Sequence, residues 1–134
     1  MKNLLTLFVL FLGLGMANAQ TEAETLEWLN TKKADLGHPS TNTISHYDNT
    51  KLDISIEKLH AYSDKGGYTK INWDSIKDIK ISSTDIEIVS NEMYEGRNSY
   101  IKFYVPNAII LKYLKALKHM ATLKGAKLVN DDLF

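Results

Sequence analysis

The sequence contains no cysteine among its 134 residues. A disulfide framework, a thiolate zinc site, an iron–sulfur cluster and a thiol nucleophile are therefore excluded. The sequence has no excess of either charge, because it contains 16 basic and 16 acidic side chains. A dedicated nucleic-acid binder normally carries a basic excess, so this balance argues against nucleic acid as the partner. The apolar fraction of 44% is ordinary for a globular protein and excludes a wholly disordered chain.

Long hydrophobic runs are absent except at the N-terminus, where residues 4–16 are almost uninterrupted apolar side chains. A lysine precedes this run, and the tripeptide Ala-Asn-Ala at residues 17–19 follows it. This order is typical of a cleavable secretory signal, and the run is shorter than the roughly 20 apolar residues of a membrane span. We expect cleavage after Ala19. Residues 20–134 are then one α+β domain, secreted or periplasmic, with no stable membrane anchor.

An amphipathic helix is predicted for residues 22–35 from the helical spacing of its apolar side chains. Thr21 and Glu24 have the form of a capping box, in which each side chain accepts a hydrogen bond from the other residue's backbone. Gly37 supplies a stop signal after the helix.

A second amphipathic helix is predicted for residues 107–124, with Gly125 as its C-terminal stop and a frayed tail at residues 126–134. This helix contains no acidic side chain, which makes it the largest local charge asymmetry in the chain. One interpretation is that these basic side chains attract an anionic surface or an acidic partner. The alternative is that they form a solvated outer face, with the late lysines suited to the helix C-terminus. The candidate partner-binding residues here are Lys112, Lys115, Lys118 and His119.

Between the helices, residues 44–105 alternate apolar and polar side chains with a period of two, which is typical of half-buried strands. Hairpin turns are predicted at Asp48-Asn49 and at residues 64–67, and one helical turn at residues 74–76. Residues 90–98 are polar and are predicted to be a loop. The side chains expected on the buried faces include Leu52, Ile54, Ile56, Leu59, Ala61, Ile71, Trp73, Ile79, Ile81, Ile86, Ile88, Ile101, Phe103 and Val105.

The order of helix, six or seven antiparallel strands and helix predicts an α+β fold, in which a bent sheet or barrel is capped by the C-terminal helix. This order resembles the pleckstrin-homology-like (PH-like) fold of small uncharacterised secreted bacterial proteins. The resemblance is carried by Thr25-Leu26-Glu27-Trp28-Leu29-Asn30, by Asn72-Trp73-Asp74-Ser75-Ile76 and by Leu117-Lys118-His119-Met120-Ala121. It implies a scaffold and no activity. The alternatives are a curved sheet of the cystatin or nuclear-transport-factor type, and a helix-grip fold.

The sequence contains few motifs that are typical of catalytic, metal-binding or cofactor-binding sites. The histidines lack metal-binding spacings, and no motif for a serine nucleophile or a phosphate-binding loop is present. His60 is expected to face outward beside Asp53 or Glu57 across a hairpin. The acids Asp74 and Asp78 are flanked by lysines, which favours solvated surface pairing over acid–base catalysis. No catalytic, metal-binding or cofactor-binding residue is predicted.

Aromatic side chains make up 10% of the chain and include seven tyrosines. Tyr94, Tyr100 and Tyr104 are candidate contact residues, because exposed tyrosine buries much area on binding at little entropy cost. Residues 91–98 are the most promising binding loop. The leading hypothesis is an exported, non-enzymatic interaction module whose partner is an unknown protein or small ligand. The alternatives are a carrier of small apolar ligands and, third, a small enzyme with one buried acid in a cone-shaped sheet.

Three structural features distinguish these hypotheses. An apolar cavity above about 300 Å³ between helix and sheet favours the carrier. A buried, unpaired carboxylate or histidine in a cleft favours the enzyme. A filled core with exposed apolar surface favours the interaction module.

Overall fold

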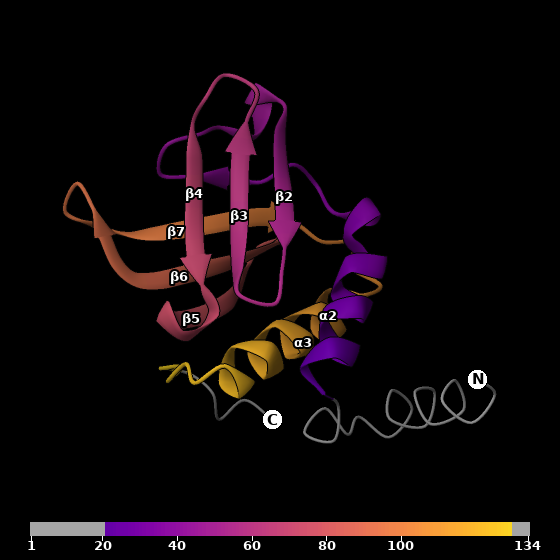
Figure 1. The fold of residues 1–134 in the computed structure, drawn as a ribbon. Coiled ribbons are helices and arrows are strands. Elements are labelled where there is room, and N and C mark those ends of the chain that lie inside the picture. The colour runs from indigo at the N-terminus through magenta and orange to yellow at the C-terminus, as the bar shows by residue number, and fades with distance from the viewer. Residues whose placement is uncertain (1–20, 130–134) are drawn as a thin grey trace.

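The computed structural model describes residues 21–129, so the predicted signal segment lies outside the described residues. Within this range the fold is α+β, with two helices and two antiparallel sheets (Figure 1). None of the described helices is long and apolar enough to cross a membrane. The elements are α2 (Glu22–Thr31), β1 (Ser40–Thr41), β2 (Thr50–Ile54), β3 (Lys58–Ser63), β4 (Tyr68–Asn72), β5 (Ile76–Ser82), β6 (Asp85–Tyr94), β7 (Arg97–Tyr104) and α3 (Ile110–Leu123).

The strands form two sheets and do not close into one barrel. One sheet has four strands in the order β1-β7-β6-β5, and the other has three in the order β2-β3-β4. The expected α+β class is confirmed, whereas the expected single bent sheet is divided. The division lies at a 3-10 turn, Trp73–Ser75, which separates β4 from β5. The strands of the two sheets cross steeply in Figure 1, as in an orthogonal sandwich.

The N-terminal helix α2 begins as predicted and ends earlier. The Thr21 hydroxyl accepts from the Glu24 N–H at 3.1 Å, and the Glu24 carboxylate accepts from the Thr21 N–H at 3.0 Å, which confirms the capping box. The helix ends at Thr31, and Lys33–Asp35 form a separate 3-10 turn. The tighter turn closes because the N–H groups of Asp35 and Leu36 bond to carbonyls three residues earlier.

The three-stranded sheet follows the predicted alternation, with a turn at residues 64–67 and a helical turn after β4. The prediction of a hairpin turn at Asp48-Asn49 is wrong. A 3-10 turn, His46–Asp48, occupies this place, and Asn49 takes a left-handed φ of 58° before β2. No hairpin forms here because the preceding strand, β1, pairs with β7.

The prediction of a loop at residues 90–98 is also wrong. Strands β6 and β7 continue through it as one long hairpin (Figure 1), joined by Glu95 and Gly96 with φ values of 50° and 81°. Two positive φ values define the turn type whose twist matches that of the flanking strands. The sequence pattern concealed this hairpin because residues 91–97 are exposed, so no buried face imposes an alternation. We call residues 91–98 the β6–β7 arm.

The core lies between the sheets and beneath both helices. Tyr113 of α3 is fully buried, with ring centroids 5.7 Å from Trp28 of α2 and 6.2 Å from Phe103 of β7. Two of the side chains predicted to be inside, Ile56 and Ile81, are instead exposed, because they lie beside the turns at the ends of β2 and β5. The others in the predicted set are buried.

The C-terminal helix is shorter than predicted, and the segment after it is packed. Helix α3 begins at Ile110 because residues 106–109 form a turn, in which the Ile109 N–H bonds to the Pro106 carbonyl. Ala126 and Leu128 are buried, and the Val129 N–H donates to the Lys77 carbonyl of β5 at 2.9 Å. Residues 126–129 are therefore not frayed. Residues 130–134 of the predicted tail lie outside the described residues.

Candidate interaction groove

A hollow of about 550 Å³ lies between β4 and the β6–β7 arm, and we call it the β4 groove. The arm continues the four-stranded sheet past β4 (Figure 1), and the groove between them opens to solvent. Apolar surface is exposed in it, because Tyr68, Met93 and Tyr94 are 58%, 60% and 43% exposed. Its lining residues are Asn42, Thr43, Gly66, Gly67, Tyr68, Thr69, Lys70, Glu92, Met93, Tyr94 and Ser99.

One wall of the groove is a free strand edge, since β4 is the outer strand of its sheet and pairs with β3. The Ser63 N–H bonds to the Gly67 carbonyl, and the Trp73 N–H bonds to the Glu57 carbonyl. Gly67 and Trp73, which flank β4, therefore direct these backbone groups toward the β3 side. Backbone directions alternate along an antiparallel strand, so those of Tyr68, Lys70 and Asn72 point away from β3.

One of these edge groups already has a partner. The Thr43 hydroxyl donates to the Tyr68 carbonyl at 3.2 Å, so the loop after β1 covers the start of the edge. Among the described residues, no hydrogen bond from another segment reaches the edge-facing N–H or C=O of Lys70. The edge is therefore open from Lys70 onward.

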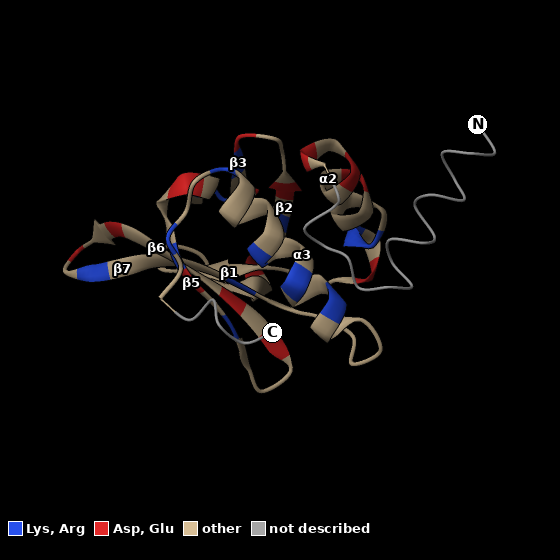
Figure 2. Ribbon diagram, turned by 90° about the horizontal axis from the view of Figure 1, so that it is seen from below, with Lys and Arg blue, Asp and Glu red and all other residues tan. Residues whose placement is uncertain are grey.

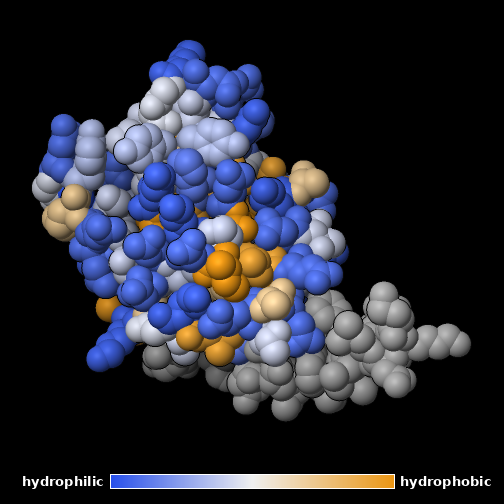
Figure 3. All heavy atoms as spheres, in the orientation of Figure 1, coloured by the Kyte–Doolittle hydropathy of each residue, from blue (hydrophilic) through white to orange (hydrophobic). Residues whose placement is uncertain are grey.

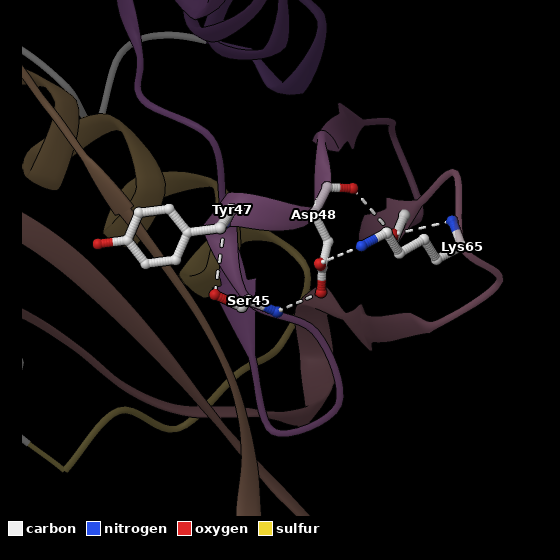
Figure 4. Close-up of polar contacts among 5 residues, drawn as sticks. Ser45, Tyr47, Asp48 and Lys65 are labelled. Carbon is white, nitrogen blue, oxygen red and sulfur yellow. Dashed lines mark hydrogen bonds and ion pairs between the residues drawn. The ribbon is translucent and has the colours of Figure 1, made fainter.

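The upper end of the groove is fixed by a polar network (Figure 4). Asp48 accepts from the Lys65 ammonium at 3.2 Å and from the Ser45 N–H at 3.4 Å. These two hydrogen bonds, that from Lys65 first, lower the pKa of the Asp48 carboxyl. Ser63 donates its hydroxyl to the Asp48 carbonyl at 3.0 Å. The β3–β4 turn is thereby tied to the turn before β2.

Gly67 lets this turn lie close to the loop after β1. A Cβ at position 67 would stand 2.4 Å from Cγ2 of Ile44, a side chain that is itself buried. Only glycine fits without moving Ile44. The wall of the groove thus depends on the close approach of two segments that are distant in the sequence.

The outer face of the three-stranded sheet adjoins the groove and shares Tyr68 and Lys70 with it. Cross-strand pairing arranges its side chains in three rows, which are Lys51·Tyr62·Tyr68, Asp53·His60·Lys70 and Lys58·Asn72. His60 lies at the centre, with ring centroids 5.0 Å from Tyr62 and 6.0 Å from Tyr68. The prediction that His60 faces outward beside Asp53 is confirmed. In the view of Figure 3 hydrophilic colours predominate over the upper part of this sheet.

The surroundings of His60 oppose its protonation. Partial burial is the main reason that the pKa of His60 lies below its usual value, and the nearby Lys70 lowers it further. Asp53 acts in the opposite direction, and Lys58 adds to the lowering. The Lys70 ammonium lies 5.3 Å from the ring centroid of Tyr68, within the range of a cation–π contact.

The structure brings one of the predicted contact residues to the groove. Tyr94 lines it, whereas Tyr100 and Tyr104 lie farther along β7, where Tyr104 is exposed and Tyr100 is half-buried. The reason is strand geometry, since Tyr100 and Tyr104 lie on the opposite face of β7 from Ser99, which lines the groove, and from the buried Ile101. The alternation around Ile71 and Trp73 predicted a half-buried strand here, but it could not show that β4 forms an edge or that Tyr68 and Lys70 line a groove.

Basic residues lie at several positions along α3 (Figure 2), but their side chains are not all exposed. Lys112 and Lys115 are exposed and His119 is half-buried, but Lys118 is only 6% exposed. Lys118 therefore belongs to the buried side of the helix, and the expectation of one solvated basic face is wrong for this residue. None of these residues lines the β4 groove.

The features that distinguish the functional hypotheses give a mixed result. A second hollow of about 320 Å³, lined by His38, Lys51 and Tyr62 among others, also opens at the surface. Both hollows exceed the size expected for a carrier, but neither is enclosed between helix and sheet. Asp78 is 8% exposed with one carboxylate oxygen lacking a hydrogen-bond partner, yet it lines neither hollow. The exposed apolar side chains of the groove fit the interaction module.

Within residues 21–129, no group of three or more His, Asp or Glu side chains is placed to hold a metal ion. No family model matches the chain, and no curated protein is similar to it in sequence. The geometry of the β4 groove is therefore the basis for assigning a function.

Proposed function

We propose that this protein is an interaction module that binds an extended segment of a partner protein by adding it as a strand to β4. The observation that carries the proposal is the free edge of β4 beside a groove of about 550 Å³. Edge strands present a row of unpaired N–H and C=O groups, and an extended peptide satisfies them by pairing with the edge.

The arm gives such a segment a second surface. Met93 and Tyr94 supply exposed apolar contacts opposite the edge. Main-chain hydrogen bonds to the edge provide affinity that is largely independent of sequence, and side-chain contacts to the groove provide selectivity. The fixed β3–β4 turn lowers the entropy cost of binding, because this wall is already ordered by the Asp48 and Ser63 contacts.

The same proposal includes the fold family and the location of the protein. Two crossed antiparallel sheets followed by a C-terminal helix support a PH-like scaffold. The pattern of residues 1–19 supports export and cleavage after Ala19. The intact mass of secreted material tests the second point, and retention of residues 1–19 in that material contradicts it.

The test of strand addition uses peptides selected from a random display library on residues 20–134. A selected peptide is resynthesised with one backbone N-methyl group at each position in turn. Affinity is expected to fall at least tenfold at every second position, because alternate N–H groups of an added strand point toward β4. A uniform response along the peptide contradicts strand addition.

Two substitutions at one position test the protein side of the interface. Lys70→Pro removes the edge-facing N–H and keeps the β3–β4 ladder, because edge strands tolerate proline where the N–H faces outward. Lys70→Ala removes only the side chain. Lys70→Pro is expected to weaken binding about tenfold more than Lys70→Ala, with circular dichroism confirming that both variants fold. Equal affinities of the two variants contradict the proposal.

A further inference from the structure

We infer that the segment bound at β4 carries acidic side chains at alternate positions, on the side that faces the outer surface of the sheet. This inference rests on the proposed function, and it specifies the chemistry of the partner. It follows from the direction of side chains on an added strand and from the charges beside β4.

The pleat of the sheet fixes the direction of the side chains. Side chains of neighbouring strands at paired positions point to the same face of a sheet. Residues of the added strand that pair with Lys70 and Asn72, beyond the part of the edge that Thr43 covers, therefore lie on the outer face, because these two side chains are exposed there. The intervening residues point to the inner side, where the arm lies.

The outer face carries more basic than acidic charge. Its outward positions on β2, β3 and β4 hold three lysines, Lys51, Lys58 and Lys70, against one acid, Asp53. Asp53 is already within 3.9 Å of the Lys33 ammonium. An acid on the added strand would thus meet a face with unbalanced positive charge.

Lys70 is the cation nearest to the added strand, since it is the charged residue of β4. It takes part in none of the ion pairs found among the described residues, and its ammonium lies over the Tyr68 ring. A carboxylate paired across the strands with Lys70 gains an opposite-charge contact, whereas a lysine there is repelled. Each such contact changes affinity by roughly two- to fivefold.

The inner side of the groove favours a different kind of side chain on the bound segment than the outer face does. Met93 and Tyr94 offer apolar surface there, and Glu92 is the acid among the lining residues. Acidic side chains are therefore disfavoured on this side, and apolar ones are favoured. The partner segment is accordingly expected to alternate acidic with apolar or small residues.

Three synthetic peptides test this inference. They share valine and threonine at alternate positions and carry glutamate, lysine or serine at the others, and their affinities are measured by fluorescence anisotropy at low ionic strength. We expect the glutamate peptide to bind about tenfold more tightly than the lysine peptide, with the serine peptide between them. Added salt should reduce this difference, because both charged positions are exposed to solvent.

A charge reversal identifies the residue responsible. Lys70→Glu is expected to reverse the preference in favour of the lysine peptide, and Lys70→Gln to abolish most of it. Lys112→Glu makes the same charge change on exposed α3 and is expected to leave the preference unchanged. If Lys112→Glu alters it as much as Lys70→Glu, net charge is responsible and the inference is wrong.

The failures of the two proposals are distinguishable. Equal binding of the glutamate and lysine peptides to the unaltered protein overturns the inference about acidic residues and leaves strand addition intact. Absence of binding by all three peptides, with no peptide selected from the display library either, overturns strand addition and this inference together.

Discussion

The phenolic hydroxyl of Tyr113 in α3 donates a hydrogen bond of 2.9 Å to the backbone carbonyl of Leu29 in α2. This carbonyl belongs to the last turn of α2, where helix carbonyls lose their partners. Tyr113 and Leu29 are both fully buried, so water cannot replace the contact. Burial also raises the pKa of the Tyr113 hydroxyl, which keeps it protonated as a donor. One side chain thus joins the two helices at the C-terminal end of α2.

Tyr113→Phe is expected to lower the free energy of unfolding by about 1–3 kcal/mol, because it leaves a buried carbonyl without a partner. Urea denaturation followed by tryptophan fluorescence measures this loss. Tyr104→Phe is the control, since Tyr104 is exposed, and should change stability by no more than about 0.5 kcal/mol. Equal effects of the two substitutions would contradict the role assigned to Tyr113.

Glu95→Asn is expected to stabilise the β6–β7 arm. Glu95 has a φ of 50°, a left-handed conformation that costs most residues energy and that asparagine adopts more readily. Asparagine followed by glycine is also the favoured pair in this type of turn, so a gain of about 0.5–1 kcal/mol is expected. Thermal unfolding measures it. Glu92→Asn, on the exposed strand of the same arm, should give no gain, and a gain there would point to a charge effect.

Gly67→Ala is expected to destabilise the protein by about 1–3 kcal/mol through steric overlap with Ile44. Gly96→Ala provides a contrast, because no atom lies within 4 Å of its added Cβ and only its φ of 81° opposes the substitution. A double-mutant cycle with Ile44→Ala tests whether the overlap with Ile44 is the cause. The cost of Gly67→Ala should shrink when Ile44 is truncated, and an unchanged cost would show that the overlap with Ile44 is not responsible.

Acidification is expected to weaken folding through His60. Its pKa in the folded protein is lowered, mainly by burial and then by Lys70, so the unfolded chain takes up the proton at a higher pH. The contribution of neutral His60 is present above the unfolded pKa of about 6.5 and is lost as the pH falls through the lowered folded pKa. His60→Gln should flatten the pH dependence of unfolding below about pH 6.5. Parallel pH profiles of the two proteins would exclude His60 as the cause.

Local patterns predicted much of the fold because they report on contacts close in the sequence. The capping box of Thr21 and Glu24 needs only adjacent turns of backbone, and it is present. The alternation of Thr69, Ile71 and Trp73 with exposed neighbours correctly identified the buried face of β4. A strand that buries one face displays its period directly in its residues.

The same reasoning failed where no buried face imposes a pattern or where the pairing partner is distant. Residues 91–97 are exposed, so their strand structure depends on the Glu95-Gly96 turn. Their polar sequence shows no alternation and therefore predicts a loop. The turn at Asp48 was misassigned because β1 pairs with β7, some sixty residues away, through Ser40↔Lys102. The helical spacing puts Lys118 on the same side of α3 as Leu114 and Ala121, but its charge favours solvent, and only the structure shows that it is buried.

The sequence by itself determined the class of the fold, some of the turns and the side chains that form the core, because hydrophobic burial follows the local periods of helix and strand. Only the tertiary structure decided that β4 is an outer strand and that the β6–β7 arm runs beside it. An edge is a property of a whole sheet and depends on which strands fail to pair. The residues of β4 do not indicate whether a further strand pairs with it, so the candidate groove could be recognised only from the arrangement of both sheets.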